Sequence, residues 1–362
     1  MFFYFFIVGL SIIIMGLFEL LYSIYNSIFL IKLGLIFSGL VPIMVAGLRV
    51  TTGTDYTVYS NYQIPLVLSG GDSHAQIVEP LYQLLIFLGI KLNNILGPLG
   101  GIQYQWIFFL TSAVIVLFSF MGIYKLSRHY TLSVAIFFMS LFFFYSMNVM
   151  RDSISMSIFF FSISYILSKK WKRYIFWCVV SAGFHYSAVI FIFVYFIKYF
   201  RKVRLIGLLL PILSYIFSNT LSVIASKVME SFSSYSHYVG SDIFRYNARS
   251  DMMVTYFILI VFYFVFREGS KEQVIFFWFQ CFASIVAFAG GAIPMAQRIE
   301  YYFFFILIFS IPQILNSSIK NRFYKAVLVA ILVLVCSLYT YNSLSQGRGE
   351  LLPYKNIRGQ IF

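Results

Sequence analysis

The fold is decided by two stretches of one region, NVMRDSISMSIFFF (residues 148–161) and SAGFHYSAVIF (residues 181–191). Apolar side chains dominate each stretch, yet together they carry an asparagine, an arginine, an aspartate and a histidine. Apolar runs of this kind are typical of helices that cross a lipid bilayer. Hydrocarbon cannot solvate the polar side chains, so each of them is a candidate functional residue.

Outside this region the same composition recurs along all 362 residues, of which 61% are hydrophobic and only 10% are charged. No apolar segment alternates with the two-residue period of a barrel strand, which predicts an all-α, polytopic integral membrane protein with about 11–13 membrane segments. We interpret residues 1–362 as a single membrane domain, and we interpret its N-terminal apolar run as a retained membrane helix. The predicted segments lie near residues 2–22, 28–48, 80–96, 104–124, 131–149, 153–168, 174–198, 204–218, 252–267, 273–293, 300–316 and 323–343.

The net charge of +14 does not indicate nucleic-acid binding, because the basic residues are concentrated in short loops between apolar segments. The positive-inside rule places such loops in the cytoplasm. The most basic loops are KKWKR (169–173), KYFRKVR (198–204) and KNRFYK (320–325). The three cysteines lie far apart in apolar segments, and no acidic metal-ligand cluster is visible, so we predict no metal site and no cofactor.

Two short segments conflict with a simple alternation of sides. If the first two basic loops are both cytoplasmic, the chain between them must enter and leave the membrane on the same side. We therefore predict a broken or re-entrant helix over 174–198, with its turn near Gly183, Phe184 and His185. The alternative is one span of about 24 residues with one basic loop that breaks the rule. Segment 80–96 is short and ends in loop-like sequence, which favours a re-entrant or broken helix there too.

Two long polar loops, at about residues 48–79 and 219–251, are placed by this topology on the side opposite the basic loops. Both are rich in tyrosine, whose rings and hydroxyls suit sugars. The alternative is that interfacial tyrosines simply anchor the protein in the bilayer.

Three arginines, Arg49, Arg151 and Arg298, lie at the ends of separate apolar segments and are assigned to the outer side. An arginine fork binds phosphate groups bidentately, so we predict that these three residues form a diphosphate site. Arg245 and Arg249, which flank the second long loop, are predicted to add substrate contacts. The alternative for each arginine is a side chain that extends from a helix end to the membrane interface.

Adjacent residues on a helix do not face each other, so Asp152 is not expected to neutralise Arg151 along one helix. We therefore expect Arg151 to have no acidic neighbour. Asn148 lies three positions before Arg151, shares its helical face, and is a candidate substrate contact.

A general base near neutral pH is predicted at His185, or failing that at Asp55 or Glu79. Glu79 has a plainer alternative, because an acid at a helix start often serves only the helix terminus. A histidine in an apolar helix is also often a packing residue. The candidate substrate-binding tyrosines, all close to these groups or to the arginines, are Tyr56, Tyr59 and Tyr301.

The order of five fragments resembles the EpsG-like branch of the Wzy-type polysaccharide polymerases. These fragments, spread over residues 49 to 302, are LRVTTGTDYTVY, VEPLYQLL, NVMRDSISMSIFF, AGFHYSAVIF and QRIEYYF. The family pattern is matched at Arg49, Gly53, Asp55, Tyr56, Glu79, Arg151, His185 and Arg298. Asp152 departs from it, since an uncharged or amide side chain is expected after the arginine.

The resemblance implies a fold related to the GT-C glycosyltransferases and a polymerase in the bacterial inner membrane, with its active site on the periplasmic or outer side. Its substrates would be undecaprenyl-diphosphate-linked repeat units of O-antigen, capsule or exopolysaccharide, both as donor and as acceptor. Membrane lipid and a chain-length regulator protein are the other expected partners, and nucleic acid is not expected. The rival functions are a flippase for the same lipid-linked oligosaccharide and an O-antigen ligase-like transferase.

Overall fold

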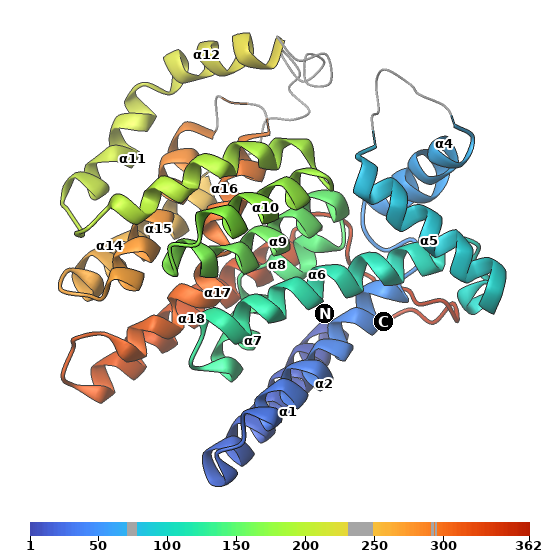
Figure 1. Ribbon diagram of the computed structural model, residues 1–362, viewed down its shortest axis with the longest axis horizontal. Helices are drawn as coiled ribbons and strands as arrows, with labels where there is room; N and C mark the ends of the chain where they lie inside the picture. The colour runs from blue at the N-terminus through green and yellow to red at the C-terminus, as the bar shows by residue number, and fades with distance from the viewer. Residues whose placement is uncertain (71–77, 231–248, 291–292, 294) are drawn as a thin grey trace. The chain divides into compact units, whose positions relative to one another are not determined.

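The computed structural model describes residues 1–70, 78–230, 249–290, 293 and 295–362. Helices account for most of this part of the chain, and no β-strand occurs in it beyond two isolated bridges. The predicted all-α fold is therefore confirmed (Figure 1). The chain divides into two compact units, which are described separately: the first comprises Met1–Asp72, Val78–Tyr195 and Thr340–Phe362, and the second is built mainly from Phe196–Tyr339. The prediction of a single membrane domain stays a prediction.

The first unit begins with two long helices that pack side by side, α1 (Phe2–Tyr25) and α2 (Ile28–Gly47). The chain then forms one run of short helical pieces between residues 55 and 68, where the sequence indicated a long polar loop. The remaining helices of the unit are α3 (Asp55–Val58), a π-helix (Tyr59–Gln63), α4 (Ile64–Leu68), α5 (Pro80–Leu96), a 3₁₀ turn (Leu99–Gly101), α6 (Gln105–Leu126), α7 (Tyr130–Met139), α8 (Phe142–Ser146), α9 (Met150–Leu167), α10 (Trp171–Ala182) and the start of a 3₁₀ helix (Tyr186–Tyr199).

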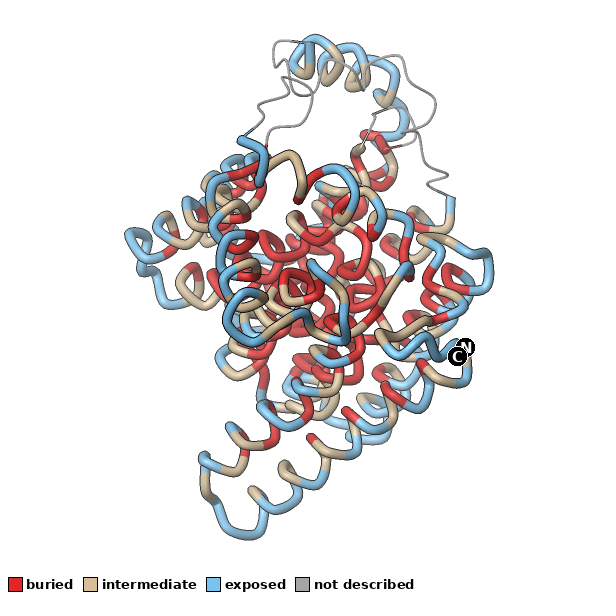
Figure 2. Tube along the Cα trace, turned by 90° about the vertical axis from the view of Figure 1, so that its right-hand side faces the viewer, coloured by how far each residue is buried: buried red, intermediate tan, exposed pale blue. Residues whose placement is uncertain are grey.

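Helix α9 lies at the centre of the first unit and packs against α6 and α10. Nearly all of its residues are buried, including four serines. Two of these serines bond within the helix, because Ser157 Oγ donates to Ile154 O at 2.7 Å and Ser162 Oγ donates to Phe159 O at 2.6 Å. Small residues of this kind let neighbouring helices approach closely. Figure 2 shows the buried residues gathered in the interior, with exposed residues on the outward faces of the helices.

The second unit is helical, with a bend of 74° between two of its helices. It contains α11 (Ile206–Ile216), α12 (Ser218–Glu230), α14 (Arg249–Phe266), α15 (Lys271–Gly290), α16 (Ala296–Phe304), α17 (Leu307–Ser310), a 3₁₀ helix (Pro312–Asn316) and most of α18 (Arg322–Ser345). Helix α15 packs against α11, α14 and α16.

Six helices in the described residues are long and apolar enough to cross a membrane, namely α1, α2, α6, α14, α15 and α18. A seventh results if α11 and α12, which meet at a 74° bend, form one broken span. This confirms a multi-pass membrane protein. Several other predicted segments are divided into shorter helices, as where Leu141, with a φ of 75°, separates α7 from α8.

The predicted break near Gly183 is confirmed, because α10 ends at Ala182 and a 3₁₀ helix begins at Tyr186. Segment 80–96, for which the sequence predicts a re-entrant or broken helix, is not broken, and the re-entrant alternative stays a prediction. It forms α5, one continuous helix of 17 residues that ends where Gly97 adopts a positive φ.

Candidate functional site

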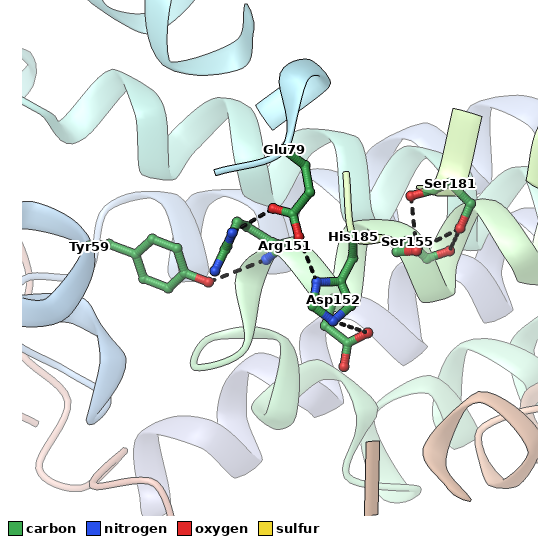
Figure 3. Close-up of polar contacts among 7 residues, drawn as sticks. All are labelled: Tyr59, Glu79, Arg151, Asp152, Ser155, Ser181 and His185. Carbon is green, nitrogen blue, oxygen red and sulfur yellow. Dashed lines mark hydrogen bonds and ion pairs between the residues drawn. The ribbon is translucent and has the colours of Figure 1, made fainter. Parts of the chain in front are cut away.

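Four ionisable side chains of the first unit meet in one cluster (Figure 3). The Oε2 atom of Glu79 lies 2.5 Å from Arg151 Nη1, and its Oε1 atom lies 3.0 Å from His185 Nδ1. The other ring nitrogen, His185 Nε2, lies 3.9 Å from Asp152 Oδ1. One carboxylate therefore joins the arginine to one side of the histidine, and a second carboxylate faces the other side.

Glu79 is positioned by the start of α5. Its backbone is extended and Pro80 occupies the first helical position, where the missing N–H is not needed. The next residue is joined to the break after α10, since Leu81 N donates to Gly183 O at 3.0 Å. A Cβ atom on Gly183 would lie 2.6 Å from Leu81 Cδ1, so a larger residue would require the Leu81 side chain to shift. The contact places Glu79 beside the residues that follow α10.

His185 is positioned by the α9–α10 contact. The backbone after α10 turns so that His185 N donates to Ser181 O at 3.1 Å. Ser181 in turn pairs with Ser155 of α9: their hydroxyls lie 2.6 Å apart, and each also bonds to the other's carbonyl, at 2.9 and 3.1 Å. This reciprocal pair fixes the end of α10 against α9. It therefore fixes His185 relative to Asp152, which lies on α9.

The cluster is almost closed to solvent but has one accessible member. Glu79, Asp152 and His185 are buried, whereas the Arg151 side chain is 19% exposed. Burial by itself raises the pKa of Glu79, but the hydrogen bond with His185 and the charge of Arg151 outweigh it, so the pKa lies below its ordinary value. The carboxylate is thus ionised near neutral pH, and Arg151 is the member of the cluster with the most exposed side chain.

The expectation that Arg151 has no acidic neighbour is wrong. The helical spacing correctly separates it from Asp152, but spacing along one helix says nothing about α5, which supplies Glu79. Tyr59 also joins the cluster, because its hydroxyl accepts a hydrogen bond from Arg151 N at 3.4 Å. Its ring packs against Tyr82 with 5.9 Å between centroids.

Arg49 is fully engaged elsewhere. Its guanidinium is buried, and it donates to the carbonyl oxygens of Ala46, Thr52 (3.2 Å) and Met147. It also lies over the Phe108 ring at 5.4 Å from the centroid. These contacts tie the end of α2 to the junction before α9. The diphosphate-binding role of Arg49 stays a prediction, and the observed role is structural.

Three further predicted residues of the first unit lie around this junction. Tyr56 is buried, stacks on Phe108 and donates its hydroxyl to Gln105 Oε1 at 3.2 Å. Asp55 begins α3 and accepts a hydrogen bond from Thr54 Oγ1 at 3.3 Å. The same Thr54 hydroxyl lies 3.3 Å from Asn148 Oδ1.

The second unit holds other predicted residues. Arg298 is partly buried in the first turn of α16, and Arg249 is exposed at the start of α14. Tyr301 is buried in a closed ring of hydrogen bonds that joins α14, α16 and α18. Its members, at separations of 2.6–3.3 Å, are Asp251, Gln297, Tyr301 and Tyr339. Arg245 lies outside the described residues.

The sequence interpretation missed three features of the site: the position of Asp152 beside His185, the Ser155–Ser181 pair, and the packing of residues 346–362 on the first unit. A signal existed for the first, since an acid in an apolar helix is itself a functional candidate. The described residues contain no group of histidine, cysteine, aspartate and glutamate side chains arranged to hold a metal ion.

A multi-pass helical fold with a buried Arg–Glu–His–Asp cluster defines a membrane protein with an ionisable internal site. The EpsG family model matches residues 32–356 of the chain, and the protein belongs to the EpsG family. The resemblance stated from the sequence is thereby confirmed. Membership supports a polysaccharide polymerase-type role in general. No curated protein and no solved structure matches the chain.

Proposed function

We propose that the protein is a membrane glycosyltransferase that polymerises lipid-linked oligosaccharide repeat units. The glycan is transferred from undecaprenyl diphosphate to the non-reducing end of another lipid-linked unit, on the outer side of the bacterial inner membrane. A GT-C relationship and a chain-length regulator as partner are part of this proposal. Its main support is the Glu79 carboxylate, which contacts both a cation suited to diphosphate and a histidine suited to proton transfer.

His185 is the proposed base. Glu79 accepts a hydrogen bond from Nδ1–H, as a carboxylate orients histidine in hydrolytic triads, so the lone pair that takes the proton is on Nε2. The Asp152 carboxylate, 3.9 Å from Nε2, would stabilise the imidazolium that forms. The acceptor hydroxyl gives its proton to Nε2 while its oxygen bonds to the anomeric carbon of the donor. The bond between that carbon and the diphosphate oxygen breaks, and undecaprenyl diphosphate leaves with the electron pair.

Arg151 is the proposed binding group for the leaving diphosphate. It is the most exposed member of the cluster, and the planar, charged guanidinium of an arginine suits bidentate binding of phosphate groups. Stabilising the charge that develops on a leaving group commonly accounts for a large part of catalysis. The diphosphate role of Arg298 stays a prediction.

The test uses cells that lack the gene and carry variants on a plasmid, with surface glycan resolved on a gel. Arg151→Ala and His185→Ala are expected to leave lipid that carries one repeat unit, while the matched controls Arg267→Ala and His129→Ala restore the polymer ladder. Protein abundance in the membrane is measured in parallel. A normal ladder from Arg151→Ala would overturn the assignment. Loss of export in the deletion would instead indicate a flippase, and unattached polymer a ligase.

A further inference from the structure

Residues 346–362, here called the C-terminal segment, pack along the loop that follows α2. Four backbone hydrogen bonds join them: Val50 N to Lys355 O at 2.8 Å, and Gly53 N to Glu350 O, Thr54 N to Gly349 O and Ile357 N to Leu48 O, each at 3.0 Å. Side chains add to this pairing, since Tyr354 Oη donates to Val45 O and Tyr4 Oη donates to Leu351 O. The segment is therefore an integral part of the first unit.

The side chain of Asn148 is enclosed between this segment and the loop after α2. A Cβ atom on Gly53 would lie 2.5 Å from Asn148 Oδ1, and one on Gly349 would lie 2.3 Å from Asn148 Nδ2. Both glycines have positive φ, and Thr54 N donates to Gly349 O at 3.0 Å. The carboxamide thus occupies space that exists only because neither neighbour has a side chain.

Asn148 belongs to the short connection between α8 and α9, and Arg151 and Asp152 lie in the first turn of α9. The same connection is held from the other side by Arg49, which donates to Met147 O and lies 3.4 Å from Met150 Sδ. The place where α9 begins is therefore determined by contacts on both sides of Asn148. A displaced amide would move the start of the helix that carries two members of the cluster.

We propose that Asn148 is a positioning residue, and that the C-terminal segment, through Gly349, holds it so that Arg151 meets Glu79 in the productive arrangement. This inference rests on the proposed function. The C-terminal segment is remote from Arg151 in the sequence. It would nevertheless help to set the position of Arg151, because it holds Asn148, which lies three positions before Arg151.

The chain offers a matched pair of glycines for the test. Gly347 and Gly349 lie in the same segment with φ values of 69° and 78°, so alanine strains the backbone similarly at both. A Cβ atom at Gly347 has nothing within 4 Å, whereas one at Gly349 displaces the Asn148 amide. Gly349→Ala is expected to lower kcat for repeat-unit extension about 10- to 100-fold, as small misplacements of reacting groups do, with Gly347→Ala close to wild type. Equal activities would overturn the inference.

A rescue variant separates positioning from general damage. Serine is shorter than asparagine, so Asn148→Ser in the Gly349→Ala background is expected to raise activity above that of Gly349→Ala alone. A double variant that is no more active than Gly349→Ala would also overturn the inference. A purely destabilising substitution at Gly349 has no reason to be relieved by this second change.

A binding measurement, which does not depend on catalysis, distinguishes the positioning role of Asn148 from the proposed polymerase activity. The rise in melting temperature on addition of undecaprenyl diphosphate is measured for each purified protein in detergent. Wild type and Gly347→Ala are expected to show the same rise and Gly349→Ala a smaller one. A wild-type protein that binds the lipid but extends no repeat unit contradicts the polymerase proposal and leaves this comparison intact. Equal rises in all three proteins contradict the positioning role.

Discussion

The carboxylate of Glu79 contacts the imidazole of His185 at 3.0 Å, although 106 positions separate the two residues in the sequence. The same carboxylate holds Arg151 through its other oxygen. A single side chain from the start of α5 therefore organises both groups that the proposed reaction requires.

Replacing Glu79 with glutamine keeps its shape and removes its charge. The variant is expected to lose activity by roughly 10- to 100-fold, because it neither balances Arg151 nor stabilises a protonated His185. The measurement is extension of purified lipid-linked repeat units in proteoliposomes. Glu268→Gln, at an exposed loop position, is the control and is expected to keep full activity. Similar losses in both variants would contradict the role of Glu79.

Ser155→Ala and Ser157→Ala separate the interhelical hydroxyl from an intrahelical one. Ser155 bonds across to Ser181, whereas Ser157 bonds to Ile154 of its own helix. Loss of an interhelical hydrogen bond in a membrane protein costs roughly 0.6–2 kcal/mol, so Ser155→Ala is expected to have the lower melting temperature and the lower activity. Equal behaviour of the two variants would show that the serine pair does not position His185.

Alanine at Gly183 is expected to be far more harmful than alanine at Gly9. A Cβ atom at Gly183 meets the side chain of Leu81, which must shift, while one at Gly9 has nothing within 4 Å. Overpacking of this kind costs about 1–3 kcal/mol. Thermal melting in detergent and polymer length on a gel are the two measurements. A Gly183→Ala protein with normal stability and a normal ladder would contradict the close packing described for this site.

Arg49→Ala is expected to affect folding, whereas Arg151→Ala affects turnover. The first variant leaves carbonyl groups without the donors that Arg49 supplies, at a cost of about 1–3 kcal/mol for each buried group left unsatisfied. Membrane abundance and melting temperature should fall further for Arg49→Ala than for Arg151→Ala, which loses only the ion pair with Glu79 and should show its larger loss in turnover. The reverse pattern would restore Arg49 as a diphosphate ligand and remove Arg151 from that role.

The depressed pKa of Glu79 predicts a definite response to acid. A carboxylate whose folded-state pKa is lowered contributes stability above its unfolded-state pKa, and that contribution is lost as the pH falls through the folded-state value. Wild type should therefore lose thermal stability more steeply than Glu79→Gln as the pH falls from about 6 to about 3. Parallel stability profiles for the two proteins would argue against the ion pair.

Several of these features could be predicted from the sequence because they are local. Composition alone indicates the helical membrane fold, and the basic loops around segment 174–198 indicate the break at Gly183. The sequence also allows three residues to be predicted as candidate site residues one at a time, since each is polar in apolar surroundings: Glu79, Arg151 and His185. Their contacts could not be predicted, because they depend on how α5 meets the α9–α10 pair.

The engagement of Arg49 could not be predicted either, since its main partners are backbone carbonyls that leave no trace in residue identity. The C-terminal segment was missed for a related reason. Its residues pair with the loop after α2 through backbone groups, and they show neither helical nor strand periodicity that would indicate an ordered element.

Helix α9 carries Arg151 and Asp152 of the site, yet it is not among the six helices that are long and apolar enough to cross a membrane. Its serines, Arg151 and Asp152 lower the mean hydropathy that its phenylalanines raise. Including or omitting one crossing exchanges inside for outside in every loop that follows. Hydropathy counting that omits α9 thus inverts the assigned side of all later loops relative to counting that includes it. The polar residues that equip this helix for chemistry are the same ones that conceal it from a topology count.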